Sequence, residues 1–122
     1  MKRCMIVDDS SVIRKVAKRI LSGPDMLVVE AANGYQAIEL CTAQMPDLLM
    51  VEGALRDINA VDFIRQVLAI PSPTRPRILI CVTQFDLGAI MRAKRAGAAG
   101  FVMKPFNRPQ LLQRFRELTV AA

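Results

Sequence analysis

The sequence contains no histidine. Histidine is the commonest general base and metal ligand in proteins, so its absence weakens any assignment to the hydrolases. Glycine-rich phosphate-binding loops are also missing, which argues against a nucleotide-binding relative of the flavodoxins. We therefore expect a protein that is not an enzyme.

Long apolar runs are absent as well. No run approaches the roughly 20 residues that a membrane-spanning helix needs. Asp8 and Asp9 interrupt the N-terminal apolar stretch before the core of a signal peptide could form. We therefore expect a cytoplasmic protein that makes no contact with a membrane.

Cysteines are few, and the three that are present have an odd count and wide spacing. Cys4, Cys41 and Cys81 lie among apolar neighbours and form neither a CxxC motif nor a metal-binding pattern. We predict that all three are buried free thiols.

The chain has 122 residues, which is enough for one domain with a single core. The apolar fraction of 52% is high for a soluble protein, as expected when both faces of a parallel sheet are covered. There are 17 basic and 11 acidic residues, for a net charge of +6, but the basic residues are scattered along the chain. This pattern favours a solvated basic surface over a nucleic-acid site.

Four short apolar runs each end in a polar residue. A run of this length, bounded by turn signals, is typical of a strand buried on both faces. The runs and their end residues are 4–7 with Asp8 and Asp9, 48–51 with Glu52, 78–82 with Thr83, and 101–103 with Lys104. In open α/β sheets the site lies beyond the carboxyl ends of the strands, so we expect these side chains to converge at one sheet edge.

Helical patterns alternate with these strands. Apolar spacing predicts helices after Ser10, over residues 35–43, 60–69 and 86–96, and after Asn107. We predict a further strand over residues 26–29, followed by a turn from Ala31. The inward sides of the first and fourth helices are expected to include Val12, Val16, Leu87 and Met91. Strict alternation predicts a (βα)5 doubly wound parallel sheet with helices on both faces.

At this point the chain resembles the receiver domain of two-component response regulators, especially the single-domain chemotaxis type. The matching segments are 7–10 with Arg14, 30–34, 46–48, 82–83, 96–98 and 104–106. The resemblance implies a flavodoxin-like fold with strand order 2-1-3-4-5, which is taken from the family and not worked out from the residues. It covers nearly the whole chain, so we expect residues 1–122 to form one receiver domain without an output domain.

The resemblance also implies roles for the residues at the sheet edge. Asp8 and Asp9, with Glu52, would hold Mg²⁺ weakly, and Thr83 and Lys104 would contact a phosphoryl group. Thr83 and Phe101 fall at the positions of the family's conformational switch. The Lys104–Pro105 bond is expected to be cis, as in the family.

The chain departs from the family at the centre of the site. Glu52 stands where the family has its phosphoacceptor aspartate, and residues 53–60 lack the family's methionine–proline pair and its later glycine. An added methylene displaces the carboxylate by roughly an ångström, enough to cost an in-line attack about a hundredfold. Two interpretations stay open: Glu52 imitates part of the phosphorylated state, or it forms a structural pair with Lys104.

Three functions are therefore weighed. The first is an atypical stand-alone receiver that binds a protein partner through its fourth helix, fifth strand and fifth helix. The second is a receiver that binds cyclic di-GMP through the arginines of that face. The third is a conventional receiver that accepts phosphate on Glu52 from a histidine kinase. The residues predicted for the face are Arg92, Arg95, Phe101 and Arg108, with Lys94, Arg114 and Arg116 nearby. We expect a monomer or a weak homodimer.

Overall fold

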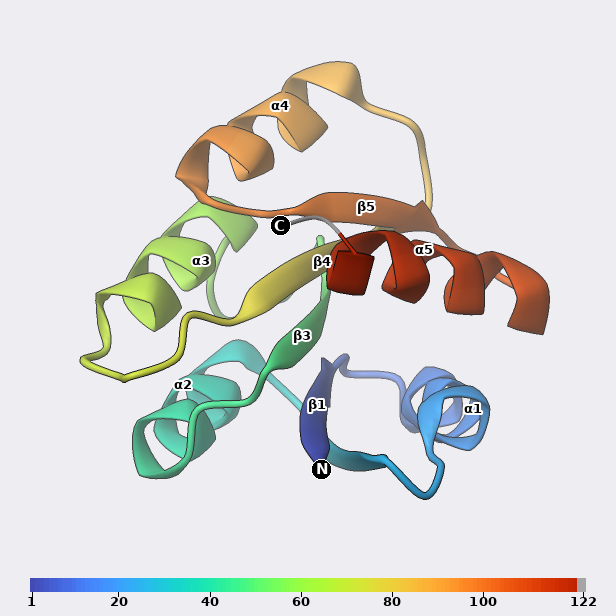
Figure 1. Cartoon of the computed structure of the whole chain (residues 1–122). Helices are drawn as coiled ribbons and strands as arrows, with labels where there is room; N and C mark the ends of the chain where they lie inside the picture. Colours follow the sequence, from blue (N-terminus) through green and yellow to red (C-terminus); the bar gives the residue numbers. More distant parts are fainter. Residues whose placement is uncertain (121–122) are drawn as a thin grey trace.

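The computed structural model describes the backbone of residues 1–120 and the side chains of residues 1–118. Five strands and five helices alternate along this part of the chain (Figure 1). The strands are β1 (Lys2–Val7), β2 (Met26–Ala31), β3 (Leu48–Glu52), β4 (Arg77–Val82) and β5 (Gly100–Met103). The helices are α1 (Ser11–Leu21), α2 (Gly34–Ala43), α3 (Ala60–Ala69), α4 (Leu87–Ala96) and α5 (Arg108–Val120).

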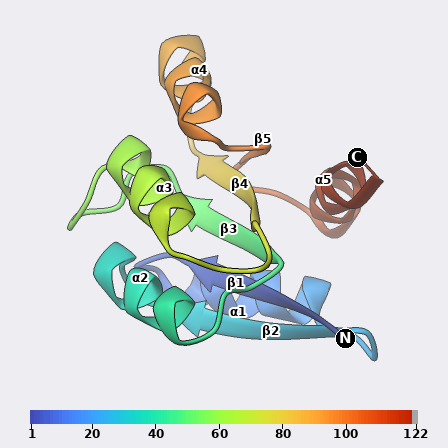
Figure 2. The ribbon, with the colours of Figure 1, turned by 60° about the vertical axis from the view of Figure 1, so that its left-hand side comes forward.

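The strands form one parallel sheet in the order β2-β1-β3-β4-β5, which confirms the predicted fold. Two helices, α1 and α5, cover one face, while α2, α3 and α4 cover the other (Figures 1 and 2). Each face has its own apolar core, because successive strand residues point to opposite sides. The central strand β3 is buried throughout, so the order places Glu52 at the middle of the sheet.

Side-chain caps fix where the helices begin. The predicted caps are confirmed: Ser10 accepts a hydrogen bond from the amide of Ile13, and Asn107 accepts one from the amide of Gln110. At the C-terminal end of α4, Gly97 has a φ of +128°, a backbone conformation that favours glycine. None of the described helices is long and apolar enough to cross a membrane.

Two predicted apolar faces are wrong in part. Val12 and Val16 of α1 are 68% and 39% exposed, because α1 turns Ala17 and the residues near its C-terminus toward the sheet instead. Leu87 and Met91 of α4 are 59% and 42% exposed. Since α4 lies over the edge of the sheet, less of the sheet is available to cover its apolar side (Figure 2).

The second strand is longer than predicted. It continues to Ala31, where we expected a turn, because Glu30 and Ala31 pair with the end of β1. The three cysteines are buried free thiols, as predicted. Burial raises the pKa of Cys4 to about 12 and that of Cys41 to about 11, and it also raises the pKa of Cys81.

Candidate functional site

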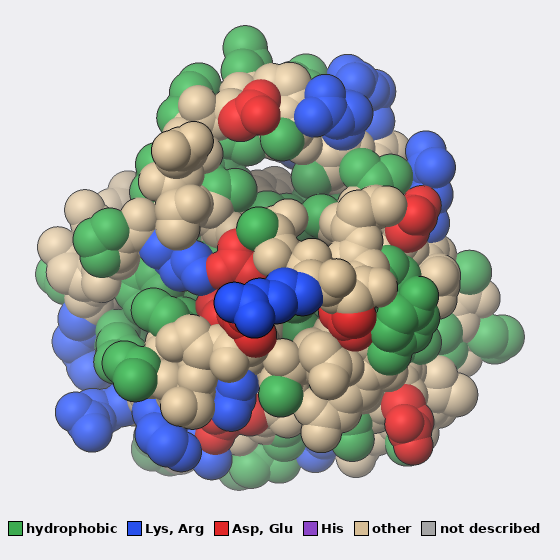
Figure 3. Space-filling model, turned by 180° about the vertical axis from the view of Figure 1, so that it is seen from behind, with side chains coloured by type: hydrophobic (Ala, Val, Ile, Leu, Met, Phe, Trp, Pro, Cys, Tyr) green, Lys and Arg blue, Asp and Glu red, His purple; other side chains and the backbone are tan. Residues whose placement is uncertain are grey.

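Parallel pairing brings three of the predicted residues together at the carboxyl edge of the sheet. Asp8 follows β1, Glu52 ends β3 and Lys104 follows β5. Asp8 and Glu52 are 2% and 8% exposed and are the buried charged residues of the described chain. Viewed from behind, acidic side chains lie near the middle of this face with basic side chains against them (Figure 3). We call Asp8, Asp9, Glu52 and Lys104 the acidic pocket.

Lys104 joins the two buried carboxylates. Its ammonium donates to Oδ2 of Asp8 at 3.0 Å and to Oε2 of Glu52. Burial by itself lowers the pKa of Lys104, but the hydrogen bonds to Glu52 and Asp8 outweigh it and raise the pKa above its usual value. The lysine therefore stays protonated between the two carboxylates.

Backbone amides hold the other oxygens of the same carboxylates. The amide of Ser10 donates to Oδ1 of Asp8 at 2.9 Å, and the amide of Ala54 donates to Oε1 of Glu52 at 3.0 Å. All four oxygens of Asp8 and Glu52 thus accept a hydrogen bond within the protein. This arrangement fixes both carboxylates in one orientation.

Arg14 supports the pocket from α1, a role that the sequence did not reveal. Its Nη1 donates to the backbone carbonyl of Asp8 at 2.7 Å, and its Nε pairs with Glu30 of β2 at 3.0 Å. Both residues lie in segments that match the family. Arg14 lies in α1 and Glu30 near the end of β2, so only the pairing of β2 with β1 could have suggested that they act together.

Asp9 lies apart from the buried pair. Its carboxylate is 45% exposed and pairs with Nε of Arg56 at 3.1 Å. Arg56 belongs to the segment after β3 that departs from the family pattern, and its side chain is 89% exposed. No sequence pattern indicates this pair, because residues 9 and 56 lie in separate loops.

The predicted metal ligands Asp8, Asp9 and Glu52 do not form a preorganised metal site. In the part of the chain that the structure describes, no group of three or more His, Cys, Asp or Glu side chains is placed to hold a metal ion. Lys104 and Arg56 hold the oxygens that a hard cation would need. As arranged, these carboxylates are not preorganised to bind Mg²⁺.

The two predicted switch residues are separate from the buried pair. Thr83 is exposed, and within the described residues its hydroxyl has no hydrogen-bond partner. Phe101 is half-buried. The centroid of its ring lies 6.0 Å from the ring centroid of Phe85 and 5.3 Å from the guanidinium of Arg114. Among the described residues, Thr83 thus forms no hydrogen bond with Lys104 or Glu52.

The loop after Glu52 is well ordered by its own contacts. The carboxylate of Asp57 accepts hydrogen bonds from the amides of Gly34 and Tyr35 at 3.1 and 2.9 Å, which caps α2. Burial acts to raise the pKa of Asp57, but four backbone amides, including these two, together lower it. Ile58 is 8% exposed and packs in the core. The loop that departs from the family pattern therefore has a defined conformation, held by its own hydrogen bonds and by core packing.

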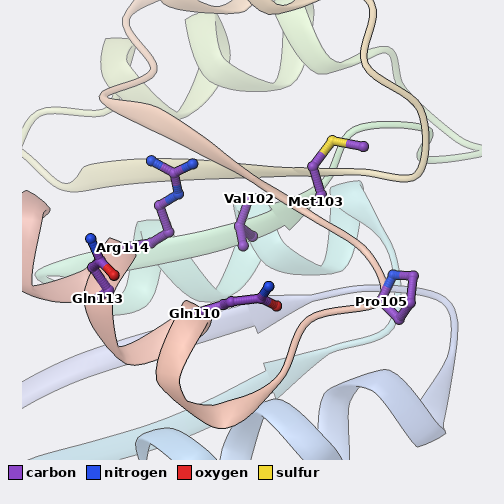
Figure 4. Close-up of a pocket in the computed structure, with 6 residues that line it drawn as sticks. All are labelled: Val102, Met103, Pro105, Gln110, Gln113 and Arg114. Atoms are coloured by element: carbon purple, nitrogen blue, oxygen red, sulfur yellow. The ribbon is translucent and has the colours of Figure 1, made fainter.

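A second region surrounds the edge strand. We define the α4–β5–α5 face as the surface formed by those three elements together with Phe85. One hollow of about 320 Å³ is lined by Arg77, Leu79, Lys94, Ala99, Gly100, Phe101, Arg114, Glu117 and Leu118. A neighbouring hollow of about 250 Å³ lies between β5 and α5, and Arg114 lines both (Figure 4).

The predicted face residues divide between the hollows and the open surface. Lys94 and Arg114 line the larger hollow, and Phe101 contributes an aromatic ring to it. Arg92, Arg95 and Arg108 are exposed and stand outside the lining of both hollows. The apolar side chain of Phe85 is 63% exposed and its ring lies beside that of Phe101.

Comparison with known proteins places the chain in a family. The response regulator receiver domain matches residues 4–116. The chain is 27% identical over 119 residues to the chemotaxis protein CheY of Thermotoga maritima, covering 97% of this chain and 98% of that protein. It is 30% identical over 112 residues to CheY of Bacillus subtilis, covering 91% and 92%. A crystal structure of a putative response regulator from Chloroflexus aurantiacus superposes with a TM-score of 0.86 at 26% identity, covering 96% of each chain.

The fold, the pocket at the strand ends and these likenesses lead to one conclusion: the chain belongs to the response regulator receiver domain family, the CheY-like modules of two-component signalling.

Proposed function

We propose that the chain is a receiver that binds a protein partner and does not depend on phosphorylation. The observation that carries this proposal is the state of Glu52. Its carboxylate lies at the end of β3, is buried, and is held by Lys104 on one oxygen and by the amide of Ala54 on the other. A carboxylate bonded in this way is a weakened nucleophile, because each oxygen already shares its lone-pair density with a hydrogen-bond donor.

Geometry adds to the effect of these bonds. An acceptor must lie in line with the phosphorus at a near-attack distance, and a displacement of about 1 Å costs roughly a hundredfold in rate. The extra methylene of Glu52 produces a displacement of this size. We therefore assign the chain no enzymatic or phosphotransfer role.

The contacts favour the structural pair over imitation of the phosphorylated state. An imitation would need Glu52 to engage Thr83 as well as Lys104, and Thr83 has no such contact among the described residues. Glu52 and Lys104 instead neutralise each other together with Asp8. We therefore propose an adaptor whose partner-binding face is competent to bind without phosphorylation.

The α4–β5–α5 face is our proposed partner surface. It combines exposed apolar side chains with exposed cations, and the edge strand β5 has no neighbour on its outer side among the described residues. Receiver domains interact with kinases and with effector proteins. We propose a cytoplasmic effector as the partner here and a monomeric receiver, with a histidine kinase as a weaker candidate.

Receiver domains generally bind Mg²⁺ at their phosphorylation site. For this chain we propose that Mg²⁺ binds only weakly. The described arrangement of Asp8, Asp9 and Glu52 supports this, because protein cations already hold these carboxylates.

Cyclic di-GMP is a second candidate ligand for the same face. The larger hollow brings Arg77, Lys94 and Arg114 around the ring of Phe101, and arginines bind phosphates and stack on bases. Calorimetric titration with cyclic di-GMP tests this candidate. Saturable heat that disappears in Arg114→Ala supports nucleotide binding, and no heat at ligand concentrations up to about 1 mM, the weak end of usual small-molecule binding, rejects it.

Acetyl phosphate tests the main proposal. Treatment of the wild type with acetyl phosphate and Mg²⁺ should leave the intact mass unchanged, while Glu52→Asp should gain some phosphate because the shorter side chain restores the reach. Mass spectrometry of the intact protein measures both. Stable labelling of the wild type on Glu52 would overturn the proposal in favour of conventional phosphotransfer.

A further inference from the structure

The acidic pocket carries its own positive charges. Lys104 pairs with Asp8 and Glu52, and Arg56 pairs with Asp9. These two cations reduce the charge of the three carboxylates to a single negative one. The two cations come from different loops, one after β5 and one after β3.

We infer that Arg56 and Lys104 together take the electrostatic place of a divalent cation, and that Arg56 is a residue that keeps such a cation out. Arg56 holds Oδ2 of Asp9, the most accessible carboxylate of the pocket, at 3.1 Å. A hard cation prefers these same carboxylate oxygens and must displace the guanidinium to reach them. This inference does not depend on whether a partner binds the α4–β5–α5 face.

The two cations differ in how strongly they hold the site. The side chain of Arg56 is 89% exposed, so water and salt screen its pair with Asp9. The side chain of Lys104 is 9% exposed and touches two carboxylates of low exposure. Loss of Arg56 should therefore raise the affinity of the site for Mg²⁺ modestly, and loss of Lys104 should raise it much more.

Titration with Mg²⁺ alone tests the inference. Amide spectra of the whole chain should show that the wild type shifts at the acidic pocket only at tens of millimolar Mg²⁺, near or beyond the weak limit of about 10⁻³ M for hard-cation sites. Arg56→Ala should bind Mg²⁺ up to about fivefold more tightly, the range expected for an exposed ion pair. Lys104→Ala should gain about tenfold or more if it remains folded by circular dichroism.

Arg65→Ala is the matched control. Arg65 is also an exposed arginine, on α3, and its removal changes the net charge by the same amount. Its Mg²⁺ affinity should equal that of the wild type. Equal affinities in Arg56→Ala and Arg65→Ala would overturn the inference, as would submillimolar binding of Mg²⁺ by the wild type at Asp9. Arg56 is exposed, so Arg56→Ala should fold and the test stays decisive even if Lys104→Ala does not.

Discussion

The acidic pocket and the α4–β5–α5 face lie on the same sheet, but they differ in whether their charged side chains have partners within the chain. In the pocket every carboxylate has a cation within the chain, and Asp8 and Glu52 are almost fully buried. On the face, the exposed cations Arg92 and Arg95 form no ion pair among the described residues, and Phe85 is 63% exposed. The pocket is complete by itself, whereas the face has charge and apolar surface left to offer a partner.

This difference separates stability from recognition. Changes in the pocket should cost folding free energy, because they leave buried charges without partners. Changes on the face should cost little stability and act on binding instead. The following variants test that division, in order of decreasing effect on stability.

Lys104→Ala should have the largest effect. It leaves the two buried carboxylates of Asp8 and Glu52 without their shared cation, which should lower the free energy of unfolding by about 3–5 kcal/mol. Urea unfolding measures the loss. Lys94→Ala, which removes an exposed lysine of the face, is the control and should change stability by less than about 0.5 kcal/mol. Similar losses in the two variants would contradict the division.

The same pair has a pH signature. The pKa of Lys104 is raised in the folded protein, so its stabilising contribution is complete below the unfolded value of 10.5 and is lost as the pH rises through the higher folded value. Stability of the wild type should therefore fall at alkaline pH above about 10.5. In Lys104→Ala this alkaline fall should be smaller.

Glu52→Gln should have an intermediate effect. The glutamine keeps the size of the side chain but loses the charge that bonds to Lys104, which should cost about 1.5–3 kcal/mol. Because Glu52 and Lys104 form no hydrogen bond with Thr83, and the ring of Phe101 lies against Phe85 and Arg114, the amide shifts of the α4–β5–α5 face should stay unchanged. A displaced ring of Phe101 would show that the pocket and the face are coupled after all, and would restore the interpretation of Glu52 as a built-in signal.

Arg114→Ala should have the smallest effect on stability. It removes a guanidinium from the ring of Phe101 and a half-exposed pair with Glu117, each worth at most about 1 kcal/mol. The shifts of Phe101 should move, while those of Asp8 and Glu52 should not. Arg92→Ala, an exposed residue of α4 outside the hollows, should move neither set.

The fold followed from the sequence because its signals are local and repeated. The apolar runs that end in Asp8, Glu52 and Lys104 placed three strands and the central site together. The apolar sides of α1 and α4 were wrong in part, because periodicity shows which residues share a face but not how far the sheet extends beneath it. Val12 and Leu87 are exposed for this reason.

The pairs between loops could not be predicted. The contact of Arg56 with Asp9 and the cap of α2 by Asp57 join segments that are remote in the chain, and neither has a periodic pattern. Both lie in the segment where the family pattern stops. Family resemblance is therefore least informative at the residues that distinguish this receiver from its relatives.

The three buried thiols provide a built-in assay of local opening. Cys4, Cys41 and Cys81 lie in β1, α2 and β4, and their raised pKa values keep them unreactive while they are covered. A thiol reagent can thus label each of them only when the surrounding element opens, so the three labelling rates report separate units of local unfolding. Without any engineered probe, the native chain can show whether β4 opens independently of β1 and α2.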